Sequence, residues 1–208
     1  IDRVFGPRKY YLISLVIVLY ALLPFFMAFD GRKPEVRELV VLATMIALAT
    51  AGRAAFFMTP SFKPIIAIVI ISAIAFGAEA GFLVGSMTML VSNFLFGQGP
   101  WTPWQMFAMG FIGFLSGILY RLRILPTKRL QLSVYGFLVT FMIYGGIMNP
   151  AALFMSVYQF SWSGLLAIYI SGVPVDLVHA SSTFLFLWIG AKPLLEKLQR
   201  IKVKYGLL

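Results

Sequence analysis

The sequence predicts an all-α, polytopic integral membrane protein, a helical bundle that forms a single domain over residues 1–208. Hydrophobic residues make up 61% of the chain and charged residues only 12%, whereas about a quarter of the residues in a soluble domain are charged. Apolar runs such as IIAIVIISAIAF at 65–76 are continuous, which favours membrane helices over the alternating pattern of a transmembrane β-barrel. Small residues also recur at a spacing that puts them on one helix face, where a second helix can approach closely: Ala43, Ala47, Ala51 and Ala55.

Apolar segments that can form membrane helices follow one another along the whole chain. We place them at roughly 10–29, 39–58, 64–78, 80–97, 104–120, 130–148, 150–172 and 174–191. A complete span needs about 20 residues, so we expect 64–78 to be tilted or to span the membrane only in part. We expect 10–29 to be an extra N-terminal helix, 36–197 to form the core of the bundle, and 198–208 to be a basic cytoplasmic tail. We expect no cleavable signal peptide, because the first segment is long and no small-residue cleavage site follows it.

The net charge of +10 is distributed as in a membrane protein, so we do not expect nucleic-acid binding. Basic residues gather between apolar segments and at the ends, and the segments 121–129 and 196–204 are strongly basic. The positive-inside rule puts both segments in the cytoplasm. Two segments on the same side of the membrane must be joined by an even number of crossings. Three apolar segments lie between them, so one of the three is not a simple span. We therefore interpret 150–172 as a folded outer loop or re-entrant piece; the alternative is that it is a true span.

Counting back from the basic loop puts 30–38 in the cytoplasm, which agrees with its Arg32, Lys33 and Arg37. The same count puts the start of the N-terminal helix outside. Arg3, Arg8 and Lys9 argue against that placement.

Ionisable side chains inside apolar segments are costly and mark functional candidates. Arg53 lies near the outer end of its segment, where it can bind an anionic ligand group or snorkel to the lipid headgroups. Asp176 and His179 share one helix face and can line a ligand cavity; alternatively, Asp176 caps the helix behind Pro174. For Glu79, between two segments, a role at a helix N-terminus is favoured over catalysis.

The sequence favours neither catalysis nor a bound metal. A single His with one neighbouring carboxylate is a poor metal site, and no Ser/His/Asp order with an oxyanion turn is visible. The chain has no cysteine, which excludes disulfides and thiol catalysis. It has no phosphate-binding GxxxxGK[ST] motif, so we expect no ATP hydrolysis by this chain and no cofactor of its own.

The loop GQGPWTPWQ at 97–105 is the most distinctive outer feature. Its prolines restrict the chain direction around Trp101 and Trp104. Interfacial tryptophans are commonly membrane anchors, but together with Gln98 and Gln105 this stiff loop is also suited to cover an organic ligand. The side chains expected to complete such a cavity lie inside a span and later in the chain: Asn93, Tyr144, Asn149, Tyr158 and Trp162.

Glycines form two pairs of small residues four apart, Gly81 with Gly85 and Gly113 with Gly117. Such pairs usually mark helix packing within one chain. The alanine face is different, because one whole side of its helix is smooth, which is typical of a subunit interface or a tight helix pair.

Residues from about 36 to the C-terminus resemble the substrate-binding (S) component of energy-coupling-factor (ECF) vitamin transporters. The similar stretches are ATMIALATAGRA, KPIIAIVIISAIAFGAEAGFLVGSMTMLVSNF, GILYRLRIL and VPVDLVHASSTFLFLWIGAKPLLEKL. Ala43 and Ala47 match the family's AxxxA signature. The turn from Gly77 to Gly81 is similar to the family's hairpin, with Ala78 where the family has proline. The extra N-terminal segment departs from the family's six-helix pattern.

The resemblance implies a multi-pass protein of a bacterial plasma membrane that captures a vitamin from outside. It implies docking through Ala43, Ala47 and Ala51 onto a transmembrane coupling protein, which carries two cytosolic ATPases. It implies ligand contacts in the loops and outer helix ends, around Arg53, Phe56, 98–105, 149–162, Asp176 and His179. The extra helix and the sequence GQGPWTPWQM are most similar to cobalamin-type S components; pantothenate, other vitamins and pyrimidine precursors are alternatives.

Two functions from other classes compete with vitamin capture. An integral membrane enzyme of lipid metabolism needs a convergent cluster of acids, histidines or a nucleophile, and the sequence shows none. A structural or assembly protein without a ligand gives no reason for Trp, Gln and Asn to concentrate in the outer loops. Vitamin capture is therefore the function that we expect.

Overall fold

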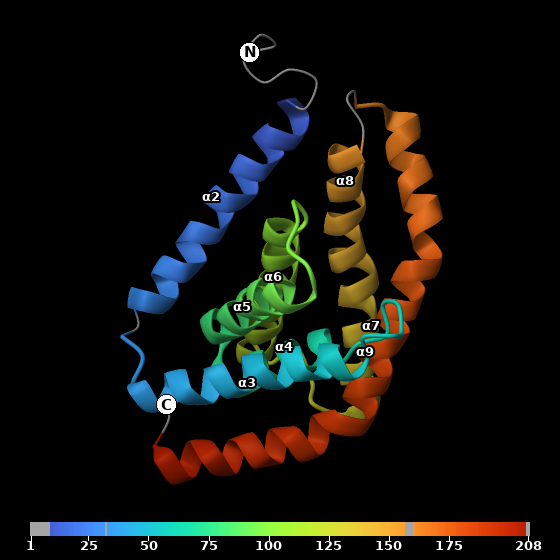
Figure 1. The fold of residues 1–208 in the computed structure, drawn as a ribbon. Coiled ribbons are helices and arrows are strands. Elements are labelled where there is room, and N and C mark those ends of the chain that lie inside the picture. Colours follow the sequence, from blue (N-terminus) through green and yellow to red (C-terminus); the bar gives the residue numbers. More distant parts are fainter. Residues whose placement is uncertain (1–8, 32, 157–159, 207–208) are drawn as a thin grey trace.

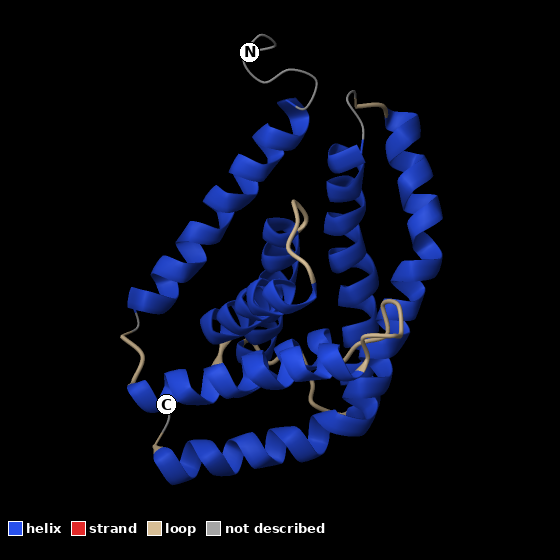
Figure 2. Ribbon diagram, in the orientation of Figure 1, coloured by secondary structure: helices blue, strands red, loops and turns tan. Residues whose placement is uncertain are grey.

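The computed structural model describes residues 9–31, 33–156 and 160–206, and every regular element in these ranges is helical (Figures 1 and 2). The elements are α2 (Lys9–Gly31), α3 (Val36–Ala55), α4 (Ile65–Phe76), α5 (Ala78–Phe96), α6 (Thr102–Arg121), α7 (Arg129–Val139), the π-helical turn η2 (Thr140–Tyr144), α8 (Gly145–Ser156) and α9 (Trp162–Tyr205). Within the described ranges, 5 helical stretches are long and apolar enough to cross a membrane. The prediction of an all-α polytopic membrane bundle is confirmed.

The short helix α4 is the centre of the bundle. All of its 12 residues are buried, and it packs against α3, α5, α6 and α9. A helix that is apolar on every side belongs in a protein core or in a membrane, and here neighbouring helices cover all of it. At 1.5 Å per residue α4 is about 18 Å long, so it covers only part of the bilayer core, as its sequence predicts.

Helices α5 and α6 are in direct backbone contact. A Cβ atom added at Gly81 would lie 2.8 Å from the Gly113 carbonyl oxygen, and one added at Gly113 would overlap the Gly81 backbone. A Cβ atom at Gly85 would overlap the Met109 backbone, and one at Gly117 would overlap the backbone of Ala78 at the start of α5. Both glycine pairs therefore pack helices within the chain, as predicted.

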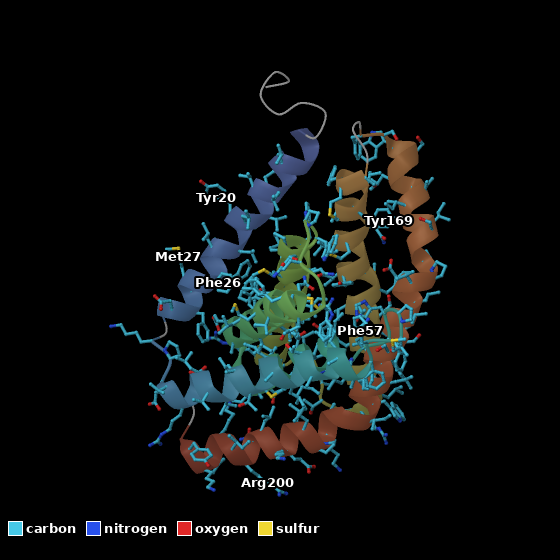
Figure 3. The ribbon with its side chains drawn as sticks, in the orientation of Figure 1. Tyr20, Phe26, Met27, Phe57, Tyr169 and Arg200 are labelled. Carbon is cyan, nitrogen blue, oxygen red and sulfur yellow. The ribbon has the colours of Figure 1, made fainter. Side chains whose placement is uncertain are left out.

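The segment 150–172 is not the folded outer loop that its sequence suggested. Its first part continues the helical stretch α7–η2–α8 through Pro150, and its last part begins α9. Pro150 lacks the N–H that would bond to the Gly146 carbonyl. The Tyr169 hydroxyl, which lies between α8 and α9 (Figure 3), donates to that carbonyl at 3.0 Å. Because a neighbouring helix satisfies the freed carbonyl, the helix continues where a proline would otherwise end it.

Helix α9 has 44 residues, which corresponds to about 66 Å and is twice the thickness of a bilayer core. It bends: its first arm runs alongside α8 and its second arm turns beneath the bundle (Figure 1). Pro193 lies inside the second arm and removes one helical hydrogen bond. The Arg129 side chain donates to the Trp188 carbonyl in this region, and Lys202 Nζ donates to the Ala75 carbonyl at 2.7 Å. These hydrogen bonds hold the second arm against the core, including the first residues of the expected tail at 198–208.

Helix α2 is the extra N-terminal helix that the apolar pattern predicts. Phe25 stacks on Phe82 of α5 with ring centroids 4.2 Å apart, and Phe26 meets the same ring edge-on. Tyr20 and Met27 point away from the bundle and are exposed (Figure 3). In a bilayer these side chains face lipid, so α2 is a peripheral addition to the core.

We expect Gly113→Ala to reduce the free energy of unfolding by about 1–3 kcal/mol, the usual cost of overpacking a tight core. The new methyl group meets backbone atoms of Gly81, which cannot move aside as a flexible side chain can. Thermal unfolding in detergent measures the effect, and Gly190→Ala is the control because nothing lies within 4 Å of its added Cβ. Equal stability of the two variants would contradict the contact.

Candidate functional site

A cavity of about 340 Å³ lies among α3, α4, α5, α6, α8 and α9. It is at the end of α6 opposite the basic loop 122–128, because Gln105 is in the first turns of α6 and the loop follows its last residue. Its lining residues are Arg53, Ser61, Lys63, Ile65, Met89, Gln105, Met109, Tyr144, Met148, Asn149, Ala152, Val175, Asp176 and His179. The lining thus combines apolar side chains, three of them methionines, with polar and charged side chains.

Arg53 is held at the cavity by neutral groups of α5. Its Nη1 donates to Ser92 Oγ at 2.7 Å and to Asn93 Oδ1 at 2.6 Å. The guanidinium carbon lies 5.5 Å from the centroid of the Phe96 ring. Neither of these hydrogen-bond partners carries a charge that neutralises the guanidinium, so Arg53 can still form charge-assisted hydrogen bonds with an anionic ligand group.

Asn93 connects α3, α5 and α6. It is completely buried, and its amide nitrogen donates to Thr102 Oγ1 at 2.9 Å and to Gln105 Oε1 at 2.8 Å. Because its oxygen accepts from Arg53, the amide is satisfied at both ends. A buried polar network of this kind fixes the relative positions of its members.

Asp176 and Asn149 join α8 to α9 on another side of the cavity. Asn149 Nδ2 donates to Asp176 Oδ2 at 2.8 Å. Glycines allow this approach: a Cβ atom at Gly145 would lie 2.7 Å from Asp176 Oδ2, and one at Gly172 would overlap the Asn149 side chain. The hypothesis that Asp176 only caps a helix is wrong, since α9 begins at Trp162, well before it.

His179 and Tyr144 form the aromatic part of the lining. His179 is buried, and its ring meets Tyr144 edge-on with centroids 4.7 Å apart. Asp176 and His179 are three positions apart on α9, and both side chains line the same cavity, as the helix spacing predicts. The two residues do not need to bond to each other to act on one ligand.

Lys63 is the charged residue of the cavity lining that the sequence analysis missed. It lies in the loop between α3 and α4, where its carbonyl accepts a bond from Ser182 Oγ at 2.8 Å and its Nζ donates to the Thr59 carbonyl at 3.3 Å. Burial lowers the pKa of the Lys63 ammonium, and the nearby Arg53 guanidinium lowers that pKa further. A lysine on the side opposite the basic loop departs from the positive-inside rule, and this departure was the available signal.

The tryptophans of the expected lid do not line the cavity. Helix α6 starts at Thr102, so Trp104 lies in its first turn, where it is buried beside Val18 of α2 and Ala151 of α8. Trp101 is partly exposed and lies against Gly99. Trp104 thus supports the wall behind Met148, which belongs to the same cluster.

The other candidate residues that the structure describes lie outside the lining. Phe56 packs edge-on against Phe186, with centroids 5.2 Å apart. Gln98 is exposed and accepts from Thr102 Oγ1, and Trp162 is 77% exposed. Tyr158 lies outside the described residues. Of the sequence candidates, the residues that the structure brings together are Arg53, Tyr144, Asn149, Asp176 and His179, with Asn93 directly behind Arg53.

The arrangement is suited to holding a small organic molecule. Hydrogen-bond donors, acceptors and aromatic rings converge on a partly enclosed space with apolar walls, which is typical of ligand sites. Among the residues that the structure describes, no group of three or more His, Cys, Asp or Glu side chains is placed to hold a metal ion.

Comparison with known families gives one match. The family described as "ECF-type riboflavin transporter, S component" matches residues 33–200. No curated protein and no solved structure matches the chain significantly. The matched range contains every residue of the cavity lining and leaves out the whole of α2.

Proposed function

The chain belongs to the family of ECF-type riboflavin transporter S components, and we propose that it captures a flavin-sized vitamin in the cavity around Arg53 and Asp176. The family makes it a membrane-embedded, vitamin-specific subunit of an ECF transporter. Such a subunit is a transport protein and works with a coupling protein and ATPases. The observation that carries the proposal is the convergence of Arg53, Asn149, Asp176 and His179 on one cavity inside an apolar bundle.

The cavity size favours riboflavin over cobalamin, the vitamin that the sequence suggested. Small-molecule sites range from roughly 300 to 1,000 Å³, and this cavity, at about 340 Å³, is near the lower limit. A tricyclic flavin is compatible with that space, whereas the corrin ring and nucleotide loop of cobalamin are much larger. A flat, polarisable ring is suited to this lining, which offers the aromatic pair Tyr144 and His179 and three methionine side chains.

The alanine face of α3 is the proposed docking surface for the coupling protein. Ala43, Ala47 and Ala51 are exposed, and the helix buries its opposite side through Leu42, Met45 and Ala49. A smooth face in a membrane is suited to close contact with another helix. Because Arg53 is on the same helix as this face, ligand capture and docking are joined by a single rigid element.

The basic segment 121–129 and the end of α9 are proposed to lie in the cytoplasm. Both are rich in Lys and Arg, and the two helical stretches between them, α7–α8 and α9, give the even number of crossings that a shared side requires. The cavity is at the other end of α6, so this orientation opens it to the outside.

Asn149→Ala is expected to weaken riboflavin binding roughly tenfold, or about 1.4 kcal/mol, because the amide lines the cavity and holds Asp176. Titration of the purified chain, followed by flavin fluorescence, measures the dissociation constant. Trp162→Ala is the control, since that side chain is 77% exposed and its loss should leave the constant unchanged. A wild type that binds cobalamin but not riboflavin would contradict the proposed ligand.

Ala47→Trp should abolish association with the coupling protein while riboflavin binding by the isolated chain survives, because the indole pushes the two helix backbones apart. Co-purification of the complex in detergent measures association with the coupling protein, and titration of the isolated chain measures riboflavin binding. Leu166→Trp, on an exposed part of α9, should keep both. An Ala47→Trp variant that assembles normally but no longer binds the vitamin would refute the docking surface.

Single cysteines test the orientation cleanly, since the chain has none of its own. In intact cells, an impermeant thiol reagent should modify Ser61→Cys, beside the cavity, and spare Thr127→Cys and Gly206→Cys until the membrane is opened. Labelling of Thr127→Cys or Gly206→Cys in intact cells would contradict the proposed orientation.

A further inference from the structure

The cavity lining carries more cationic than anionic side chains. The ionisable side chains in its lining are Arg53, Lys63, Asp176, His179 and Tyr144. The first two are cations, Asp176 is the one carboxylate among these lining residues, and His179 is buried against the Tyr144 ring. The lining therefore has more positive than negative charge before any ligand enters.

Asp176 does not neutralise the cations directly. Its Oδ2 accepts from Asn149 of α8, whereas Arg53 bonds to Ser92 and Asn93 of α5. Lys63 bonds to a backbone carbonyl. Each of these charged groups thus has neutral hydrogen-bond partners in the described part of the chain.

Arg53 keeps donors available. A guanidinium has five N–H donors, and the bonds to Ser92 and Asn93 both start from Nη1. The Nε and Nη2 groups form the remaining edge, which matches two oxygens of a phosphate or carboxylate. Because Asn93 fixes the guanidinium on its other side, little side-chain freedom is lost when an anion binds.

Lys63 supplies a second cation next to the first. Both side chains line the same cavity, and the Arg53 guanidinium lowers the pKa of the Lys63 ammonium, so the two positive charges repel each other. An anion between them removes that repulsion and compensates both partly buried charges. Both side chains are half-buried, where charge pairing is stronger than at an exposed surface.

We propose that the captured ligand carries an anionic group, which Arg53 and Lys63 bind together at the α3 side of the cavity. The inference rests on the proposed function and narrows its substrate class from a neutral flavin to a flavin with a phosphate or carboxylate group. The ring system then lies toward Tyr144, His179 and the methionines, and the anionic group lies toward the α3–α4 loop.

Riboflavin and riboflavin 5′-phosphate test the inference, because they share the ring and the sugar chain and differ in one phosphate. The phosphate ester should bind the full-length chain at least tenfold more tightly, and the difference should shrink as salt is raised. Lys63→Gln and Arg53→Gln should each lower this preference, measured as the ratio of the riboflavin dissociation constant to that of the phosphate ester. Lys128→Gln, an exposed cation at the opposite end of the bundle, should leave it unchanged.

The outcomes separate the two proposals. Equal affinity for the two flavins, or tighter binding of riboflavin, overturns the anionic class and leaves flavin capture intact. A preference that survives in both Lys63→Gln and Arg53→Gln overturns the assignment to these cations. If neither flavin binds the wild type, flavin capture is wrong and the anionic inference falls with it.

Discussion

The cavity around Arg53 and Asp176 depends on the direct backbone contact between α5 and α6. Glycines at positions 81, 85, 113 and 117 let the two helix backbones touch along this contact, and this closeness lets Asn93 of α5 reach Thr102 and Gln105 of α6. Asn93 in turn holds Arg53 of α3 at 2.6 Å. A membrane bundle gains little from burying apolar groups away from lipid, so close packing and satisfied polar groups must supply its specificity. Here the α5–α6 contact supplies the close packing and also positions the satisfied polar groups.

The features that the sequence predicts correctly are those with a local physical signal. Apolar length gives the helical membrane fold, glycine spacing gives the α5–α6 contact, and the cost of burying charge marks Arg53, Asp176 and His179 as cavity residues. The smooth face at Ala43, Ala47 and Ala51 follows from spacing as well, and the structure leaves it exposed. Each of these inferences needs only one helix or one turn.

The features that sequence reasoning missed depend on contacts between distant residues. The segment 150–172 was expected to be an outer loop or re-entrant piece, but the helix continues through Pro150 because the Tyr169 hydroxyl satisfies the carbonyl that the proline frees, and no pattern around Pro150 shows that partner. Trp104 seemed to face a ligand, but helix α6 begins early enough to turn it toward Val18 and Ala151. Lys63 reaches the cavity because its loop is fixed by Ser182 of α9, far away in sequence.

The central claim is that one flavin-sized molecule occupies the cavity next to Ala152 and Asn149. Native mass spectrometry of the chain, purified in mild detergent from vitamin-replete cells, tests it most directly by weighing what stays bound. The account predicts one flavin per chain in the wild type and none in Ala152→Trp, whose indole fills the cavity. A bound corrinoid, or a flavin that Ala152→Trp still retains, would contradict it.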